Sequence, residues 1–240
     1  MIAADAVGCA VVTSARRHML FLVLVLGWAP SVPAQQYVWS VPSADVALKG
    51  RTLLELYTYW GPTRPYSFYL GPRVIQGVGG GVELGANVSS NVAPDFDARA
   101  ELALKWQPWS NERWATTLGT TAYLPLRALP YDYGQFGWGH VTRSFANGTR
   151  FSAGACVFSE GVVAEGAWRG GAMLAWEQPL SRRLTLGVDW ISGRHDAGYA
   201  TAGLYYEVGS GRYVSAGYAV GNKGASDGNH YLVVAVTVEF

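Results

Sequence analysis

The 240-residue sequence has little charge of either sign, since 15% of its residues are Asp, Glu, Lys or Arg and the formal net charge is +1. Binding to nucleic acid requires a cluster of cationic side chains that neutralises phosphates, so we expect no nucleic-acid partner. The two cysteines, Cys9 and Cys156, are too few for a disulfide framework or a four-thiolate zinc site. Because 50% of the residues are hydrophobic and 13% are aromatic, the composition is not that of a disordered chain.

One short apolar run lies near the N-terminus. Two arginines precede the run 19–28, and Val32 and Ala34 are permissive or small residues at the positions that favour cleavage before Gln35. A basic region, a short apolar region and a small-residue cleavage site are typical of a cleavable signal peptide, which we predict over residues 1–34. The run is too short to cross ~30 Å of hydrocarbon as a helix. We therefore expect the mature chain to be exported.

The rest of the sequence contains no apolar run long enough for a transmembrane helix. Its hydrophobic residues alternate with polar ones instead. In residues 98–106, for example, every second residue is apolar, and Arg99, Glu101 and Lys105 occupy positions between them. The C-terminal segment 231–240 alternates in a similar way. A period of two predicts β-strands with one face toward lipid and the other toward a lumen.

Turn signals divide residues 51–240 into twelve predicted strands, with ten as the alternative. The predicted strands are 51–60, 67–77, 79–90, 97–107, 112–124, 136–146, 149–159, 167–178, 182–192, 199–208, 211–220 and 230–240. Their connections alternate between short and long, as the periplasmic turns and outer loops of bacterial outer-membrane barrels do. We predict an all-β fold, a transmembrane antiparallel up-and-down β-barrel, preceded by a lead segment, residues 35–50, that is periplasmic or lumenal.

Aromatic residues gather at both ends of the predicted strands. Trp106, Trp114, Trp176 and Phe240 lie at the inner, periplasmic ends, and Trp60, Phe68, Trp138, Trp168 and Trp190 lie at the outer ends. Amphipathic rings settle at the two interfaces of a membrane, so two aromatic girdles favour a membrane-spanning barrel.

The signal peptide, the girdles and the alternating last strand ending in Phe240 resemble those of bacterial outer-membrane β-barrel proteins, over the whole mature chain. This resemblance implies localisation in the bacterial outer membrane, with outer-membrane lipid around the barrel. It also implies recognition of the C-terminal strand by the barrel assembly machinery. Residues 184–195 and 216–222 are similar to uncharacterised transporter-type barrels associated with phenol degradation, but this narrower resemblance carries no functional residue across.

On the predicted register, thirteen charged side chains should face the lumen. The seven acids are Glu55, Glu83, Glu101, Glu177, Asp189, Glu207 and Glu239, and the six bases are Arg51, Arg73, Arg99, Lys105, Arg143 and Arg169. This near balance predicts weak ion selectivity if the lumen is open. The alternative is a plugged lumen in which these charges pair with one another.

We expect passive passage of small solutes, as in a porin or channel-type transporter. One alternative is a non-conducting structural or surface-interaction barrel, and a second is a lipid-modifying hydrolase. The hydrolase would use His140 with Ser144, on the same strand face as Thr142. Same-face neighbours in a strand are ~7 Å apart, so His140 and Ser144 are separated by about twice that spacing. A nucleophile and its base must be within hydrogen-bond distance, so this separation does not favour the hydrolase. An inward Arg143 would also turn His140 toward lipid.

We therefore expect no enzymatic activity and no cofactor. The four histidines lack carboxylate neighbours at ligand spacing, so we expect no metal site either.

The turns also predict the strand register. A turn centred on Val78 places Arg73 opposite Glu83, because each lies five residues from Val78. Residues 231–240 should close the barrel against residues 51–60. In that closing strand, the side chains expected to face lipid are Leu232, Val234, Val236 and Val238.

Overall fold

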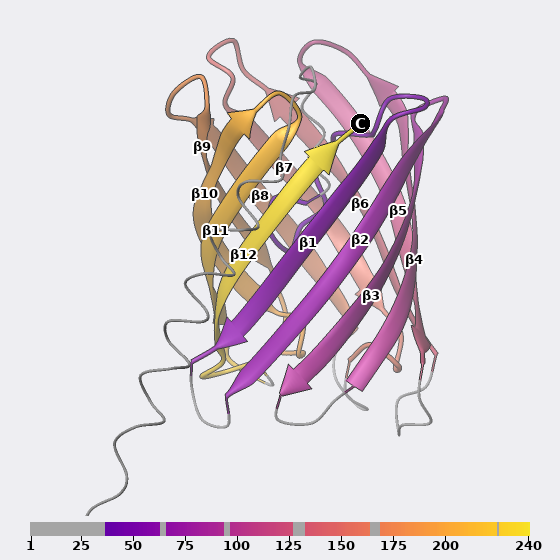
Figure 1. The fold of residues 1–240 in the computed structure, drawn as a ribbon, viewed down its shortest axis with the longest axis vertical. Helices are drawn as coiled ribbons and strands as arrows, with labels where there is room; N and C mark the ends of the chain where they lie inside the picture. The colour runs from indigo at the N-terminus through magenta and orange to yellow at the C-terminus, as the bar shows by residue number, and fades with distance from the viewer. Residues whose placement is uncertain (1–36, 63–65, 94–96, 127–132, 164–168, 225) are drawn as a thin grey trace, which may run out of the picture.

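The computed structural model describes residues 37–62, 66–93, 97–126, 133–163, 169–224 and 226–240. These residues form a closed antiparallel barrel, in which each strand is hydrogen-bonded to the next and the last returns to the first (Figure 1). The strands are β1 (Thr52–Gly61), β2 (Ser67–Gly79), β3 (Val82–Ala93), β4 (Asp97–Ser110), β5 (Trp114–Pro125), β6 (Gly134–Ser144), β7 (Arg150–Phe158), β8 (Gly170–Pro179), β9 (Leu184–Ile191), β10 (Tyr199–Gly209), β11 (Arg212–Gly221) and β12 (His230–Glu239). In the described part of the chain, no helix is long and apolar enough to span a membrane.

The prediction of twelve strands is confirmed, and the ten-strand alternative is wrong. Predicted boundaries differ from the observed ones by up to three residues, as in β3, which begins at 82 rather than 79. The predicted closure is also confirmed, because β12 pairs with β1 from Leu53 opposite Glu239 to Trp60 opposite Leu232. Closure leaves no strand edge unpaired, which a barrel in lipid requires.

The turn between β2 and β3 lies two residues later than predicted. Val78 belongs to β2, and the chain reverses at Gly80 and Gly81, which have φ values of 65° and 72°. Positive φ at consecutive positions is accessible to glycine at little cost, and tight hairpins require it. Arg73 consequently pairs with Asn87 rather than with Glu83, so the predicted pair across this hairpin is wrong.

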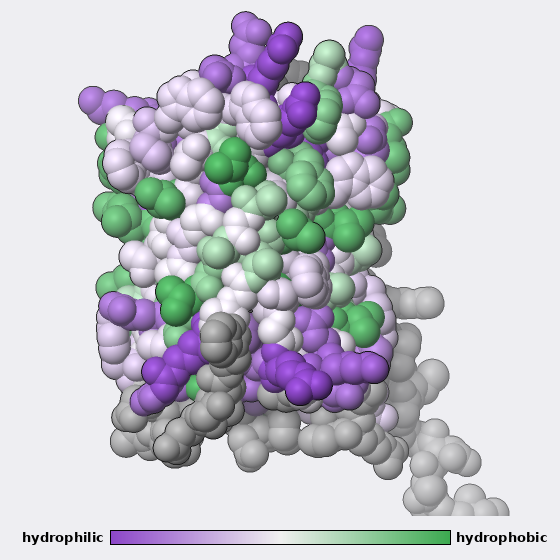
Figure 2. Space-filling view, turned by 180° about the vertical axis from the view of Figure 1, so that it is seen from behind, coloured by the Kyte–Doolittle hydropathy of each residue, from purple (hydrophilic) through white to green (hydrophobic). Residues whose placement is uncertain are grey.

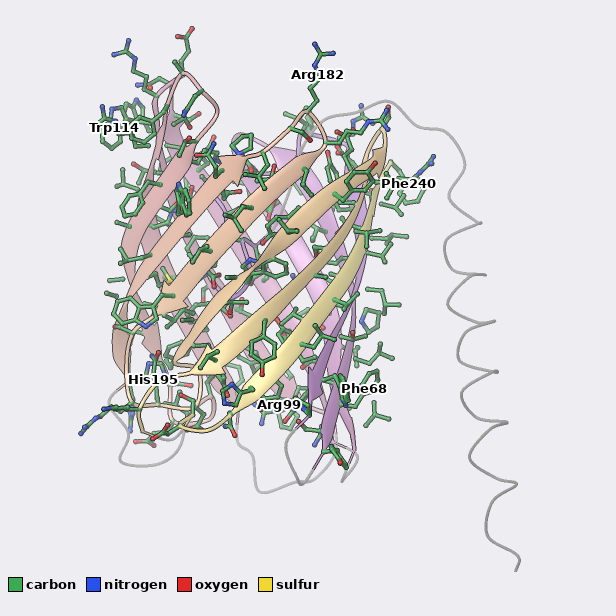
Figure 3. All side chains as sticks on the ribbon, turned by 90° about the vertical axis from the view of Figure 1, so that its left-hand side faces the viewer. Phe68, Arg99, Trp114, Arg182, His195 and Phe240 are labelled. Carbon is green, nitrogen blue, oxygen red and sulfur yellow. The ribbon has the colours of Figure 1, made fainter. Side chains whose placement is uncertain are left out.

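The two ends of the barrel differ in the residues they carry (Figure 3). We call the end with Phe240 and Arg182 the inner end, and the end with Phe68 and His195 the outer end. Five short connections, at 80–81, 111–113, 145–149, 180–183 and 210–211, join strands at the inner end.

The outward face of the barrel forms an apolar band. Figure 2 shows hydrophobic side chains across the middle of the barrel and hydrophilic ones toward both ends. In β12, Leu232 is 37% exposed whereas the adjacent Val233 is 4% exposed. The predicted outward face of the closing strand is therefore confirmed, and the inward face belongs to the core.

We expect Val234→Arg, near the middle of β12, to lower the free energy of unfolding by about 2–4 kcal/mol, because the charge would lie in the apolar band. Phe240→Arg, at the inner end, is the matched control and should cost roughly 0–1 kcal/mol. Urea unfolding in phospholipid vesicles measures both. Equal costs at the two positions would contradict this placement of the apolar band.

Candidate functional site in the barrel lumen

Residues 37–47 run inside the barrel, and residues 48–50 are exposed where the chain enters β1; we call residues 37–50 the plug (Figure 1). The side chains of Val38 and Val41 are 1% and 0% exposed, and they belong to the largest buried apolar cluster. Residues 35 and 36 of the lead segment lie outside the described residues. Of the two locations left open by the sequence, the structure places the described part of this segment in the lumen.

Asp189, from β9, binds the backbone of the plug. One oxygen, Oδ2, accepts hydrogen bonds from the backbone N–H groups of Trp39, Ser40 and Val41, at 2.9, 2.6 and 2.6 Å. The Asp189 side chain is buried, and unbonded N–H groups would be costly in that position. The carboxylate therefore both holds the plug and satisfies three of its donors.

Trp39 lies against a recess in the inner wall. Gly187, Gly203 and Gly217 face one another in the neighbouring strands β9, β10 and β11. A Cβ atom on Gly217 would approach the Trp39 ring to 2.9 Å. The indole Nε1 donates to the Gly187 carbonyl at 3.0 Å, and the ring stacks on Tyr205 with centroids 4.5 Å apart. Three glycines thus leave the space that the indole fills.

The other end of the plug contacts β3, β4 and β7. Glu83 accepts a hydrogen bond from the Ala47 backbone N–H at 2.7 Å and pairs with Lys105 at 2.9 Å. Lys105 also donates to the Asp45 carbonyl, and the Asp45 carboxylate pairs with Arg150 at 2.7 Å. These charged residues are bound to each other and to the plug backbone, which offsets the cost of burying them.

Arg73 lies at the middle of the lumen. Its guanidinium pairs with Glu55 at 3.0 Å, and its Cζ lies 4.7 and 4.8 Å from the ring centroids of Tyr37 and Tyr57. These distances allow cation–π contacts with both rings. Burial raises the pKa of the Tyr37 hydroxyl, although the positive charge of Arg73 opposes the shift. Tyr37 is therefore a neutral side chain near neutral pH.

Two larger cavities lie beside the plug. The inner cavity, about 420 Å³, reaches the inner turns at Gly148, Pro179 and Arg182. The outer cavity, about 290 Å³, is lined near the other strand ends by residues such as Tyr69 and Phe158. Five residues line both cavities and are called the partition: Tyr37, Trp39, Tyr57, Tyr59 and Arg73. Side chains, rather than strand backbone, therefore separate the two cavities.

Most of the charged residues assigned to the lumen lie inside the barrel. Those that are buried there or line a cavity are Glu55, Arg73, Glu83, Glu101, Lys105, Glu177, Asp189 and Glu207. Arg99 shares the β4 face of Glu101, near the outer end (Figure 3). Arg51 and Glu239 pair with each other at 3.9 Å.

The assignment of Arg169 to the lumen is wrong. Its side chain is 43% exposed and pairs with Glu160. The physical reason is the later start of β8, at Gly170 instead of 167, which leaves Arg169 outside the strand.

The described girdle residues lie on the exposed face of the barrel, with one exception. Those that are 37–57% exposed are Trp60, Phe68, Trp106, Trp114, Trp176, Trp190 and Phe240. Trp168 lies outside the described residues. Trp138, assigned to the outer girdle, is instead buried in the lumen, where it stacks on His140 with centroids 5.4 Å apart.

The facing of β6 explains the error at Trp138. The charge of Arg143 predicted an inward side chain, but in the structure it points outward at the inner end of the barrel. There its guanidinium lies over the rings of Trp114 and Phe145, 5.3 and 4.8 Å from their centroids. A long cationic side chain can reach the interface from an outward position, so its charge does not determine the strand face near a strand end.

His140 and Thr142 consequently face the lumen. The Thr142 hydroxyl lies 2.6 Å from the Ser152 hydroxyl and 3.3 Å from Nδ1 of His140, and all three side chains are buried. Ser144, which the sequence suggested as a nucleophile, pairs across the sheet with Arg150. The histidine and its hydroxyl neighbours are therefore inside the barrel, away from its lipid face.

The described residues contain no group of three or more His, Cys, Asp or Glu side chains placed to hold a metal ion.

No protein-family profile and no curated protein sequence matches this chain. Among solved structures, it is similar to outer membrane phospholipase A from Escherichia coli, with a TM-score of 0.51 and 11% identity over 78% of this chain and 89% of that one. It is also similar to the translocator domain of the autotransporter NalP from Neisseria meningitidis, with a TM-score of 0.43 and 16% identity over 78% of this chain and 87% of that one.

The closed twelve-stranded barrel and its likeness to the phospholipase show that the chain has the fold of a bacterial outer-membrane β-barrel, as the sequence resemblance predicted. At this identity the likeness concerns the fold alone.

The pair Glu83–Lys105 provides a test of the plugged lumen. Lys105→Met should destabilise the protein by about 3–5 kcal/mol, because it leaves the Glu83 charge buried without its partner. The double variant Glu83→Gln/Lys105→Met removes both charges and should be more stable than Lys105→Met alone. Urea unfolding followed by tryptophan fluorescence measures this. The single variant Glu83→Gln completes the comparison. If the double variant loses as much stability as Lys105→Met and Glu83→Gln together, the two charges do not interact.

Proposed function

We propose that the protein provides a narrow, weakly selective passage for small solutes across the outer membrane, and that the partition determines its width. The observation that carries this proposal is the pair of cavities, about 420 and 290 Å³, that meet at the same five side chains. A rotation of tyrosine or tryptophan side chains could connect these cavities without breaking any strand pairing.

The size of the barrel supports this proposal. Eight-stranded barrels are just filled by their own side chains, whereas barrels of sixteen or more strands leave a wide aqueous channel. Twelve strands give an intermediate lumen. Here the plug occupies part of it and two cavities remain, so the expected passage is narrower than that of a large porin.

The charges of the inner cavity support weak selectivity. The acids that line it are Asp45, Glu55, Glu177 and Glu207, and the bases are Arg73, Arg150, Arg182 and Arg183. Four acids against four bases leave no excess of one sign, so small anions and cations should pass with similar ease.

The two alternatives differ in what they require. A non-conducting surface barrel requires that the partition never opens. A lipid-modifying hydrolase requires a nucleophile and base that reach lipid, and the inward position of His140 and Thr142 does not favour it. Passage of small solutes remains the proposal that the lumen supports best.

Planar-bilayer recordings test the proposal. The wild-type protein should give small conductance steps with similar permeability to K⁺ and Cl⁻. Tyr59→Ala removes a partition ring and should increase the single-channel conductance severalfold. Tyr206→Ala is the matched control, because Tyr206 is 46% exposed on the outward face of β10 and its loss should leave conductance unchanged.

If folded wild-type protein and Tyr59→Ala both give no conductance steps, passage is excluded and the surface-barrel alternative is favoured. Folding of each variant is checked by circular dichroism in the same detergent.

A further inference from the structure

The recess that receives Trp39 has the features of a built binding site. We call Gly187, Gly203, Gly217 and Tyr205 the indole slot. The three glycines are direct neighbours across β9, β10 and β11, so the wall lacks side chains over three adjacent strands. Tyr205 provides a ring that is 25° from parallel to the indole, and the Gly187 carbonyl accepts the indole N–H.

Asp189 extends this recognition from the side chain to the backbone. It is two residues beyond Gly187 in β9, and its Oδ2 accepts the N–H groups of Trp39 and the two following residues. The slot therefore selects a planar group with an N–H donor, while Asp189 selects an exposed run of backbone donors beside it.

We propose that the indole slot is a binding site for a planar aromatic group bearing an N–H donor, that Trp39 is its resident occupant, and that this occupancy keeps the passage closed. The last part rests on the proposed function. Tyr37 and Trp39 are the partition residues that belong to the plug, so release of the plug removes two of the five partition side chains.

The barrel can persist when the slot is empty. All twelve strand pairings are made between residues 52 and 239, and none uses the plug. The plug is held by side-chain contacts, hydrogen bonds and the ion pair between Asp45 and Arg150, so it can leave the wall while the strand ladder stays closed.

Gly217→Ala tests the slot directly. The three atoms nearest to a Cβ on Gly217 are all Trp39 ring carbons, at 2.9, 3.0 and 3.0 Å, so this substitution should displace the indole with little effect on the sheet. Gly137→Ala is the matched control, because the nearest atom to its Cβ is a Val157 methyl carbon at an ordinary 3.5 Å. Trp39→Ala empties the slot without adding an atom to the wall.

Release of the plug from the slot is measured by the accessibility of a cysteine at position 38. Val38 directly precedes Trp39 and is 1% exposed, and Val38→Cys is introduced with Cys9→Ala and Cys156→Ala, which remove the two natural thiols. Gly217→Ala and Trp39→Ala should each raise the rate of maleimide labelling at least tenfold. Combining them should add nothing, because both act through the same contact. Gly137→Ala should leave the rate unchanged.

The labelling rate and the conductance separate the two proposals. Faster labelling with no conductance in any variant would support the slot and overturn the passage. Conductance with unchanged labelling in both Gly217→Ala and Trp39→Ala would support the passage and overturn the slot as the contact that holds the plug.

Free indole tests the chemical class of the ligand. In Trp39→Ala, millimolar indole should bind the empty slot, as small aromatic molecules fill engineered cavities of matching shape, and raise the unfolding temperature. The double variant Trp39→Ala/Gly217→Ala, in which a methyl group occupies the slot, should show no such increase. An increase in neither variant, or an equal increase in both, would overturn the assignment of the slot as an indole site.

Discussion

Closing twelve strands into a barrel leaves a lumen that is too wide for the inward side chains of the strands to fill alone, and the rest of this structure follows from that constraint. The plug supplies the missing volume. A backbone inside the lumen brings N–H and C=O groups away from bulk water, and these groups must be hydrogen-bonded. Asp189 meets part of this requirement, because it accepts hydrogen bonds from three backbone N–H groups of the plug.

The buried charges of the wall are arranged around the plug. Glu83 and Lys105 bind each other and also the plug backbone at Ala47 and Asp45, and Arg150 binds the Asp45 carboxylate. A charged lumen is therefore compatible with a largely filled one, because the plug provides many of the partners. The space that remains open is divided by the partition. Its four aromatic rings make it largely apolar, and Arg73 is its one cation.

The number, order and approximate limits of the strands could be predicted because they depend on local patterns. Alternation has a period of two in any strand, and the barrel requires one face toward lipid along every strand. The facing of β6 could not be predicted in this way. Arg143 lies near a strand end, where an outward cation reaches the interface, so its charge gave a false indication and placed Trp138 on the wrong face.

By itself the sequence determined the fold class, the closure of 231–240 against 51–60 and the lumenal position of residues such as Glu83 and Asp189, because alternation and turn residues act locally. Only the tertiary structure decided which partners these residues have. Gly187, Gly203 and Gly217 are unremarkable along the chain, and they become a recess for Trp39 only when three strands come into register. Such contacts join residues about 150 positions apart, a separation at which pattern alone carries no information about register.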